Sequence, residues 1–192
     1  GLIAFASSLD QIGPIAKSAE DCGIVLDIIS GYDPDDPTTH KKSPRNSCSK
    51  IGMQIKGLKI GIPTEFFGEG ISDDVKTAVL NAVKEYERMG CNVQEVSFPS
   101  FKYAIAAYYL ISSAEASSNL ARYDGIRFGY RSKNGESYEE LIKNTRSEGF
   151  GDEVKRRILL GTYALSSGYY DDYYKKAVYA RAMIREDYNE IF

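Results

Sequence analysis

The sequence predicts an α/β fold, and three observations support this. Residues 58–63 (LKIGIP) and 91–98 (CNVQEVSF) each have the short apolar pattern typical of a strand. The segment between them has the apolar periodicity of a helix, and such strand–helix–strand units join parallel strands by a right-handed crossover. The composition of the 192 residues, 43% hydrophobic and 27% charged, is that of a globular chain with room for a sizeable core.

The first part of the chain is expected to contain an arm, one helix and a loop. Residues 1–15 are predicted to form a short strand or an extended arm. Ser18 is a suitable N-cap, and the apolar residues from Ile24 to Ile29 give the helix that follows a buried face. Residues 32–50 are polar, contain three prolines and have no periodicity, so we expect a loop on the surface.

The helix between the two strands is predicted to start at Ser72 and to stop at Gly90. Asp73 and Asp74 would lie in its first turn, where the helix dipole favours negative charge. A stripe of apolar side chains at helical spacing is predicted to be buried: Val75, Val79, Leu80, Val83, Tyr86 and Met89.

The second half of the chain is predicted to be mainly helical. Residues 106–121 form the first helix, and small side chains between Ser112 and Ser118 would let another backbone approach closely. A short helix is expected over 138–145, and another starts at Asp152 and is interrupted at Gly161. Residues 163–192 have one long helical pattern that is rich in tyrosine. Six residues could share one face of the first of these helices: Ala107, Leu110, Ile111, Ala114, Ser118 and Ala121.

Composition limits the classes of function. The net charge of −3 gives no general reason to expect nucleic-acid binding, although a local basic patch could supply it. The three cysteines are far apart and form no CxxC, so neither a disulfide framework nor a metal site is predicted. No apolar run has membrane-spanning length and no signal peptide is recognised, so we expect a cytoplasmic location.

The ends of the sequence suggest an internal fragment of a longer protein. The chain begins at Gly1 instead of Met and opens on an apolar run, and it stops at Phe192 without a helix cap. We therefore expect some apolar surface of this chain to pack against missing chain.

Several candidate sites are weak on the residues alone. His40 is the only histidine and lies in the polar loop, which disfavours a Ser-His-Asp triad. A phosphate site at Gly68 and Gly70 is disfavoured because Asp73 and Asp74 follow directly. No lysine or histidine spacing marks any of the serine pairs as carrying a nucleophile.

Three features have two readings each. The helix carrying Tyr108 and Tyr109 is either an ordinary core helix or the wall of a pocket. Arg156 and Arg157 are either a solvated face or a clamp for a carboxylate, which a guanidinium binds in bidentate fashion. The tyrosines of 163–192 either pack between helices or form a stacking platform for RNA.

Longer motifs resemble a known family. FASSLDQIGPIAKSAED is similar to the S-L-D-x-x-G-P segment of the amidase-signature family. GYDPDDPTT, SSAEASSNLARYDGIRFGYR and EGFGDEVKRRILLGTYALSSGYYDDYYKKA resemble its glutamine-hydrolysing branch, the A subunits of Glu-tRNA(Gln) amidotransferases. The resemblance implies part of the amidase-signature fold, a mixed sheet flanked by helices. Residues 1–192 would be the C-terminal-side portion of a single amidase domain that lacks the upstream catalytic segment.

The resemblance also implies an activity and its partners. Such subunits release ammonia from glutamine for the conversion of Glu-tRNA(Gln) to Gln-tRNA(Gln) in translation. Amidotransferase subunits B and C would be the partners, and ATP and Mg would be used by a partner subunit, with no cofactor or metal in this chain.

Site residues are implied position by position. The family's Ser-cisSer-Lys triad would lie upstream of Gly1, so the chain would hold no catalytic residue. Tyr108 resembles the tyrosine that faces the glutamine, and Arg157 resembles the arginine that holds its α-carboxylate. An acidic partner for the α-amino group would lie beyond Phe192. Two alternatives stay open: a fragment of another amidase-signature hydrolase, and a non-catalytic scaffold piece.

Overall fold

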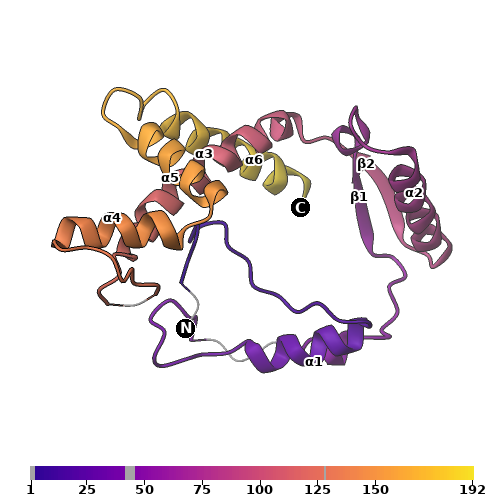
Figure 1. The fold of residues 1–192 in the computed structure, drawn as a ribbon. Coiled ribbons are helices and arrows are strands. Elements are labelled where there is room, and N and C mark those ends of the chain that lie inside the picture. The colour runs from indigo at the N-terminus through magenta and orange to yellow at the C-terminus, as the bar shows by residue number, and fades with distance from the viewer. Residues whose placement is uncertain (1–2, 42–45, 128) are drawn as a thin grey trace. The chain divides into compact units, whose positions relative to one another are not determined.

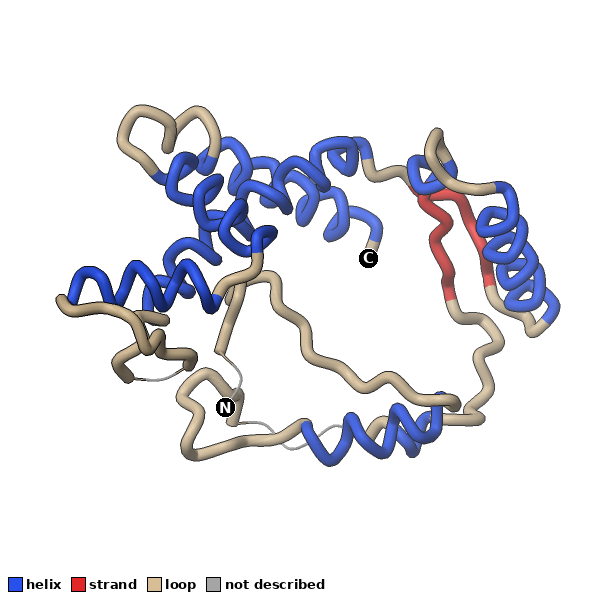
Figure 2. The backbone as a smooth tube through the Cα atoms, in the orientation of Figure 1, coloured by secondary structure: helices blue, strands red, loops and turns tan. Residues whose placement is uncertain are grey.

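The computed structural model describes residues 3–41, 46–127 and 129–192. Its contacts divide the chain into two compact units. Helices predominate, and the described residues contain two strands, drawn red in Figure 2. The predicted α/β class is therefore confirmed. The first unit consists of Gly1–Asp10, Gly61–Ser72 and Glu95–Phe192, and the second of Gln11–Ile60 and Asp73–Gln94.

The helix near the start of the chain forms as predicted. Helix α1 spans Ala19–Ile29, and the Ser18 hydroxyl caps it by accepting the backbone N–H of Asp21 at 3.0 Å. The Asp27 carboxylate accepts the backbone N–H groups of Ser47, at 2.8 Å, and Cys48, at 3.2 Å. These bonds attach α1 to a short 3-10 helix, Cys48–Lys50, at the end of the polar loop.

The strand–helix–strand unit is also present. Strand β1 (Lys59–Pro63), helix α2 (Asp73–Arg88) and strand β2 (Asn92–Val96) follow in that order, with a 3-10 helix at Thr64–Phe67. The two strands pair in one sheet. Gly57 N–H donates to Gly90 O, and Asn92 N–H donates to Leu58 O, so the pairing advances in the same direction along both segments. The strands are therefore parallel, as the sequence predicts.

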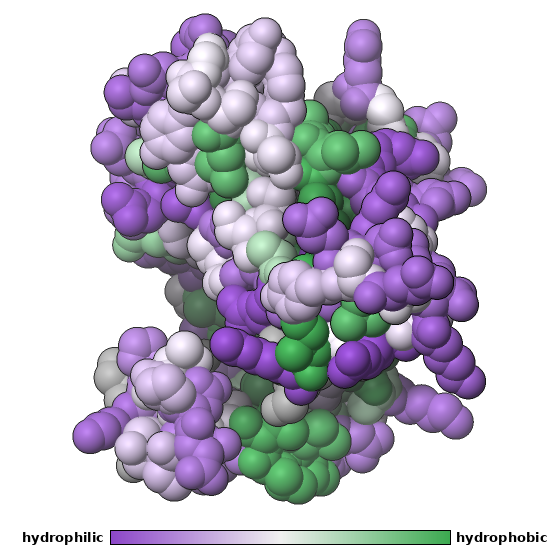
Figure 3. Space-filling view, turned by 60° about the vertical axis from the view of Figure 1, so that its left-hand side comes forward, coloured by the Kyte–Doolittle hydropathy of each residue, from purple (hydrophilic) through white to green (hydrophobic). Residues whose placement is uncertain are grey.

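The predicted burial of the α2 stripe is wrong. No residue of α2 is buried, because none of the described elements covers its apolar face. Figure 3 shows on another side of the molecule that apolar groups, in green, also reach the surface there. Five of the six predicted stripe residues are exposed: Val75, Val79, Leu80, Tyr86 and Met89.

Helix α3 is the centre of the first unit. It packs against α5 and α6, as Figure 1 shows, and its Ala107 and Ile111 form a buried cluster with Ala177 of α6. The remaining helices of this unit are short or peripheral by comparison. The bounds are Ala104–Asn119 for α3, Tyr138–Gly149 for α4, Asp152–Leu165 for α5 and Tyr174–Ile191 for α6, with 3-10 helices at Pro99–Tyr103 and Leu120–Arg122.

The predicted interruption at Gly161 is wrong, because α5 runs through this residue without a break. A Cβ atom added at Gly161 would lie 1.9 Å from the carbonyl oxygen of Ser113 in α3. The glycine therefore permits a close approach of two helices, which the small residues of α3 also serve. Ser112, Ser113 and Ala114 are buried at this contact, so the predicted close approach is confirmed.

The predicted single helix over 163–192 is also wrong. Helix α5 ends at Leu165, and residues 166–173 form turns in which Ser166 O accepts the N–H groups of Tyr169 and Tyr170. The ring centres of Tyr163 and Tyr169 lie 4.2 Å apart. The Tyr169 hydroxyl, by its hydrogen bond, is the main cause that raises the pKa of Tyr163 to about 12. These rings pack on one another, in line with the packing interpretation of the tyrosines.

The α3–α5 contact predicts a specific intolerance. Gly161→Ala should lower the free energy of unfolding of the chain by about 1–3 kcal/mol, because the new methyl group forces two backbones apart. Gly168→Ala is the matched control, since a Cβ at Gly168 meets nothing within 4 Å. Urea denaturation followed by circular dichroism measures both, and equal midpoints for the two variants would contradict the contact.

A carboxylate next to β2 should titrate abnormally. The Ser97 hydroxyl donates to Glu65 Oε1 at 2.5 Å, and this bond, together with the Phe98 N–H, lowers the pKa of Glu65 from 4.5 to about 2. Because the folded pKa lies below the unfolded one, the stabilisation is present above pH 4.5 and is lost as the pH falls towards 2. Ser97→Ala should move the pKa of Glu65 back up. Carboxyl-carbon NMR titration tests this, and an unchanged Glu65 titration would count against it.

Candidate functional site

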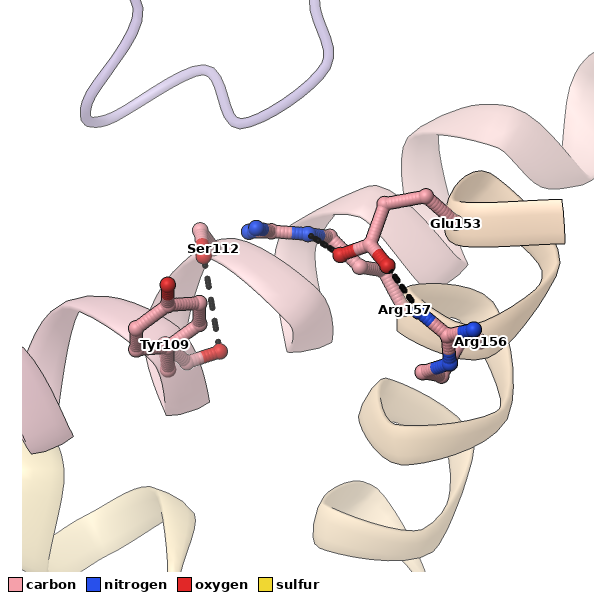
Figure 4. Close-up of polar contacts among 5 residues, drawn as sticks. All are labelled: Tyr109, Ser112, Glu153, Arg156 and Arg157. Carbon is pink, nitrogen blue, oxygen red and sulfur yellow. Dashed lines mark hydrogen bonds and ion pairs between the residues drawn. The ribbon is translucent and has the colours of Figure 1, made fainter. Parts of the chain in front are cut away.

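The two residues implied as glutamine-binding lie on the two helices that cross at Gly161. Tyr108 is on α3, and Arg157 is on α5, one turn before Gly161. Tyr109 lies one turn before Ser113 on α3, so the contact brings Arg157 next to the tyrosine pair. Figure 4 shows the Arg157 side chain extending from α5 towards Tyr109 and Ser112 of α3.

Arg157 is held on two sides. Its Nε donates to Glu153 Oε1 at 3.0 Å, and its Cζ lies 5.0 Å from the centre of the Tyr109 ring. The side chain is 20% exposed, whereas that of Arg156 is 73% exposed. A guanidinium over an aromatic face gains a cation–π attraction in addition to the ion pair. Of the two adjacent arginines, Arg157 is therefore the one built into the structure.

The phenol of Tyr108 belongs to the same group of side chains. The rings of Tyr108 and Tyr109 meet edge to face, with their centres 5.4 Å apart. The pKa of Arg157 is raised, chiefly by its hydrogen bond to Glu153 and to a smaller extent by the Tyr108 hydroxyl, while burial opposes the rise. Tyr108 is 48% exposed, so its ring also faces open space.

The structure thus brings together Tyr108 and Arg157, and it adds two residues to which the sequence alone assigned no site role. Glu153 was considered only as a first-turn acid of a helix, and Tyr109 only as a phenol. The spacing of Glu153 and Arg157, one turn apart on the same helix, could have indicated their ion pair. The contact of Tyr109 with Arg157 joins residues far apart in the chain, and no local pattern signals it.

These side chains can bind an anion with a planar fork of oxygens. A guanidinium matches a carboxylate in bidentate geometry, and a neighbouring phenol can donate a further hydrogen bond. The Ser112 hydroxyl donates to Tyr109 O at 3.4 Å, along its own helix. The group is therefore equipped for recognition, with no serine of this cluster hydrogen-bonded to a lysine or histidine within the described ranges.

A second polar group fixes the arm at the start of the chain. Ser8 N–H donates to Glu115 Oε2 at 2.9 Å, and Arg181 Nη1 donates to the Ser8 hydroxyl at 2.8 Å. Asn119 Nδ2 donates to Phe5 O at 3.1 Å and to the Ser7 hydroxyl at 3.0 Å. These contacts line a cavity of about 370 Å³ along α3. Residues 3–15 contain no strand, so the extended-arm alternative applies to them.

The weaker candidates stay apart from this site. His40 lies in the polar loop, as expected for a solvated residue, and Gly68 and Gly70 precede α2 in a plain loop. In the part of the chain that is described, no group of three His, Cys, Asp or Glu side chains could hold a metal ion. No helix among those residues has both the length and the apolar character needed to cross a membrane.

Comparison with known proteins defines the class to which this fold and site belong. The Amidase family matches the chain over residues 1–192, so the chain belongs to that family. Its sequence is 56% and 57% identical, respectively, to the A subunits of Glutamyl-tRNA(Gln) amidotransferase from Macrococcus caseolyticus and Listeria welshimeri, each over 192 residues. The chain spans 40% of the length of these relatives.

Solved structures agree. Glutamyl-tRNA(Gln) amidotransferase A subunits include one from Thermotoga maritima, whose crystal structure superposes with a TM-score of 0.69 at 39% identity, covering 98% of this chain and 36% of that one. The peptide amidase PAM matches with a TM-score of 0.62 at 23% identity, over 92% of this chain and 36% of the other, which supports the fold alone. The implied amidase-signature fold is confirmed.

Proposed function

We propose that this chain is part of the glutamine-hydrolysing subunit of a Glu-tRNA(Gln) amidotransferase and that it carries the carboxylate-binding side of the glutamine pocket. The observation that carries the proposal is the partly buried guanidinium of Arg157, held between Glu153 and the Tyr109 ring beside Tyr108. The relatives' names support the substrate, because the first step of such an enzyme takes glutamine.

In this proposal, each residue binds a defined part of the substrate. The Arg157 guanidinium donates to the α-carboxylate of glutamine, and Tyr108 faces the bound molecule with its phenol. A site that pairs a carboxylate in this way rejects simple amides that lack one, because its cation would then be desolvated without a partner. The pocket would thereby distinguish glutamine from the substrates of general amidases.

The chemistry would be completed by parts outside these 192 residues. We place the Ser-cisSer-Lys triad and the acidic partner of the α-amino group in the remainder of the subunit, with residues 1–192 as the C-terminal-side portion of one amidase domain. Subunits B and C would complete a cytoplasmic heterotrimer. The released ammonia would be used there, together with ATP and Mg bound by a partner subunit, to convert Glu-tRNA(Gln) to Gln-tRNA(Gln).

The alternative of another amidase-signature hydrolase is less well supported. The relatives at 56–57% identity carry the amidotransferase name, whereas the peptide amidase is only 23% identical. A purely scaffolding role would leave the placement of Arg157 against the tyrosine pair without a purpose.

The proposal is tested by Arg157→Lys in the full-length subunit within its complex. We expect KM for glutamine to rise about tenfold or more, because a lysine cannot offer the fork of donors that binds a carboxylate in bidentate fashion. Arg88→Lys is the matched control, since Arg88 forms an exposed ion pair with Glu85 at 2.7 Å. Steady-state glutaminase kinetics measure both variants, and an unchanged KM for Arg157→Lys would remove Arg157 from this role.

The 192 residues by themselves should show no glutaminase activity. The proposal assigns them binding groups for glutamine but no nucleophile with a base. An assay of ammonia release by the purified chain, with the complete enzyme as the positive control, tests this. Turnover by a preparation free of host enzyme would contradict the assignment.

A further inference from the structure

We infer that Glu153 is a positioning residue, which orients the guanidinium of Arg157 so that its Nη1–Nη2 edge receives the carboxylate of glutamine. The inference rests on the proposed function, in which Arg157 binds that carboxylate. It concerns a residue that does not itself touch the substrate.

Glu153 binds one particular atom of Arg157. Its Oε1 accepts from Nε of Arg157, at 3.0 Å, and it lies one helical turn before the arginine on α5. A guanidinium can bind a carboxylate through its Nε side or through its two terminal nitrogens. Because Glu153 occupies the Nε side, the terminal edge is left for a second carboxylate. Figure 4 shows this end of Arg157 pointing away from Glu153 towards α3.

The rotation of the Arg157 side chain is restricted. The Tyr109 ring lies 5.0 Å from Cζ of Arg157, and the arginine side chain is 20% exposed. An arginine side chain has several rotatable bonds, and ordering it on binding costs free energy. With the ion pair on one side and the ring on another, that order exists before the substrate arrives.

The charge balance of the cluster leaves room for an anion. The other carboxylate oxygen of Glu153 is bound by Nη1 of Arg156, whose side chain is 73% exposed. One carboxylate thus lies between two guanidinium groups, which leaves the cluster with a net positive charge. Glu153 can therefore hold Arg157 without cancelling its attraction for an anion. Glu153 itself is 58% exposed, so its charge is partly screened by solvent.

The opposite role makes the opposite prediction. If Glu153 were an internal competitor that occupies Arg157 in place of the substrate, its removal would free the guanidinium and lower KM. If Glu153 positions Arg157, its removal raises KM, because a mobile guanidinium must be ordered again in each binding event.

The test uses the full-length subunit in its complex. We expect Glu153→Ala to raise KM for glutamine about tenfold, with a larger effect on KM than on kcat. Glu153→Gln should raise KM less, because its amide oxygen can still accept from Nε. Asp152→Ala is the matched control, since Asp152 lies in the same turn and pairs with Lys155 at 3.6 Å, and its KM should equal that of the unaltered enzyme.

Arg157→Ala, alone and combined with Glu153→Ala, separates the two levels of the inference. Positioning requires that Glu153→Ala has no further effect on KM once Arg157 is gone. A rise in KM for Arg157→Ala with no rise for Glu153→Ala would overturn the positioning role and leave the proposed function standing. No rise for Arg157→Ala would overturn the proposed function itself. A fall in KM for Glu153→Ala, or equal effects of Glu153→Ala and Asp152→Ala, would also overturn the positioning role.

Discussion

The close contact between α3 and α5 is the constraint on which the site depends. Gly161 has no side chain, and the space that a Cβ would need is taken by the carbonyl of Ser113. Helix axes can approach this closely only where small residues face each other, and α3 provides them at Ser112, Ser113 and Ala114. One turn away from this contact on each helix are Tyr109 and Arg157, so the packing sets the distance at which a guanidinium meets an aromatic ring.

The electrostatics of the site follow from that placement. Arg157 is withdrawn from solvent far enough for its interactions to be stronger than those of Arg156, which remains exposed. Glu153 lies between the two and has a lowered pKa, chiefly because it accepts a hydrogen bond from Arg157. The result is a cation whose direction is fixed and whose charge is not neutralised, which suits the recognition of a carboxylate.

Much of the fold could be predicted from local patterns, and the exceptions have physical causes. Ser18 as an N-cap and the parallel β1–α2–β2 unit depend on neighbouring residues, so the sequence was sufficient for them. Gly161 was misjudged because its effect comes from a contact with α3, where tertiary packing overrides helix propensity. The burial of the α2 stripe was misjudged because periodicity indicates which face is apolar but not what covers it. For the site, Tyr108 and Arg157 were proposed from a resemblance in their flanking motifs, whereas no composition or spacing distinguished Arg157 from its neighbour. Tyr109 could not be assigned, because its contact with Arg157 joins two helices through a turn-rich segment of the chain.

The most direct test of the central claim is a crystal structure of the full-length subunit, inactivated at its nucleophile, with glutamine bound. We predict that both oxygens of the α-carboxylate accept from Nη1 and Nη2 of Arg157, while Nε still donates to Glu153 and the Tyr109 ring still covers the guanidinium. An α-carboxylate bound to a different cation, with Arg157 facing solvent, would contradict the claim.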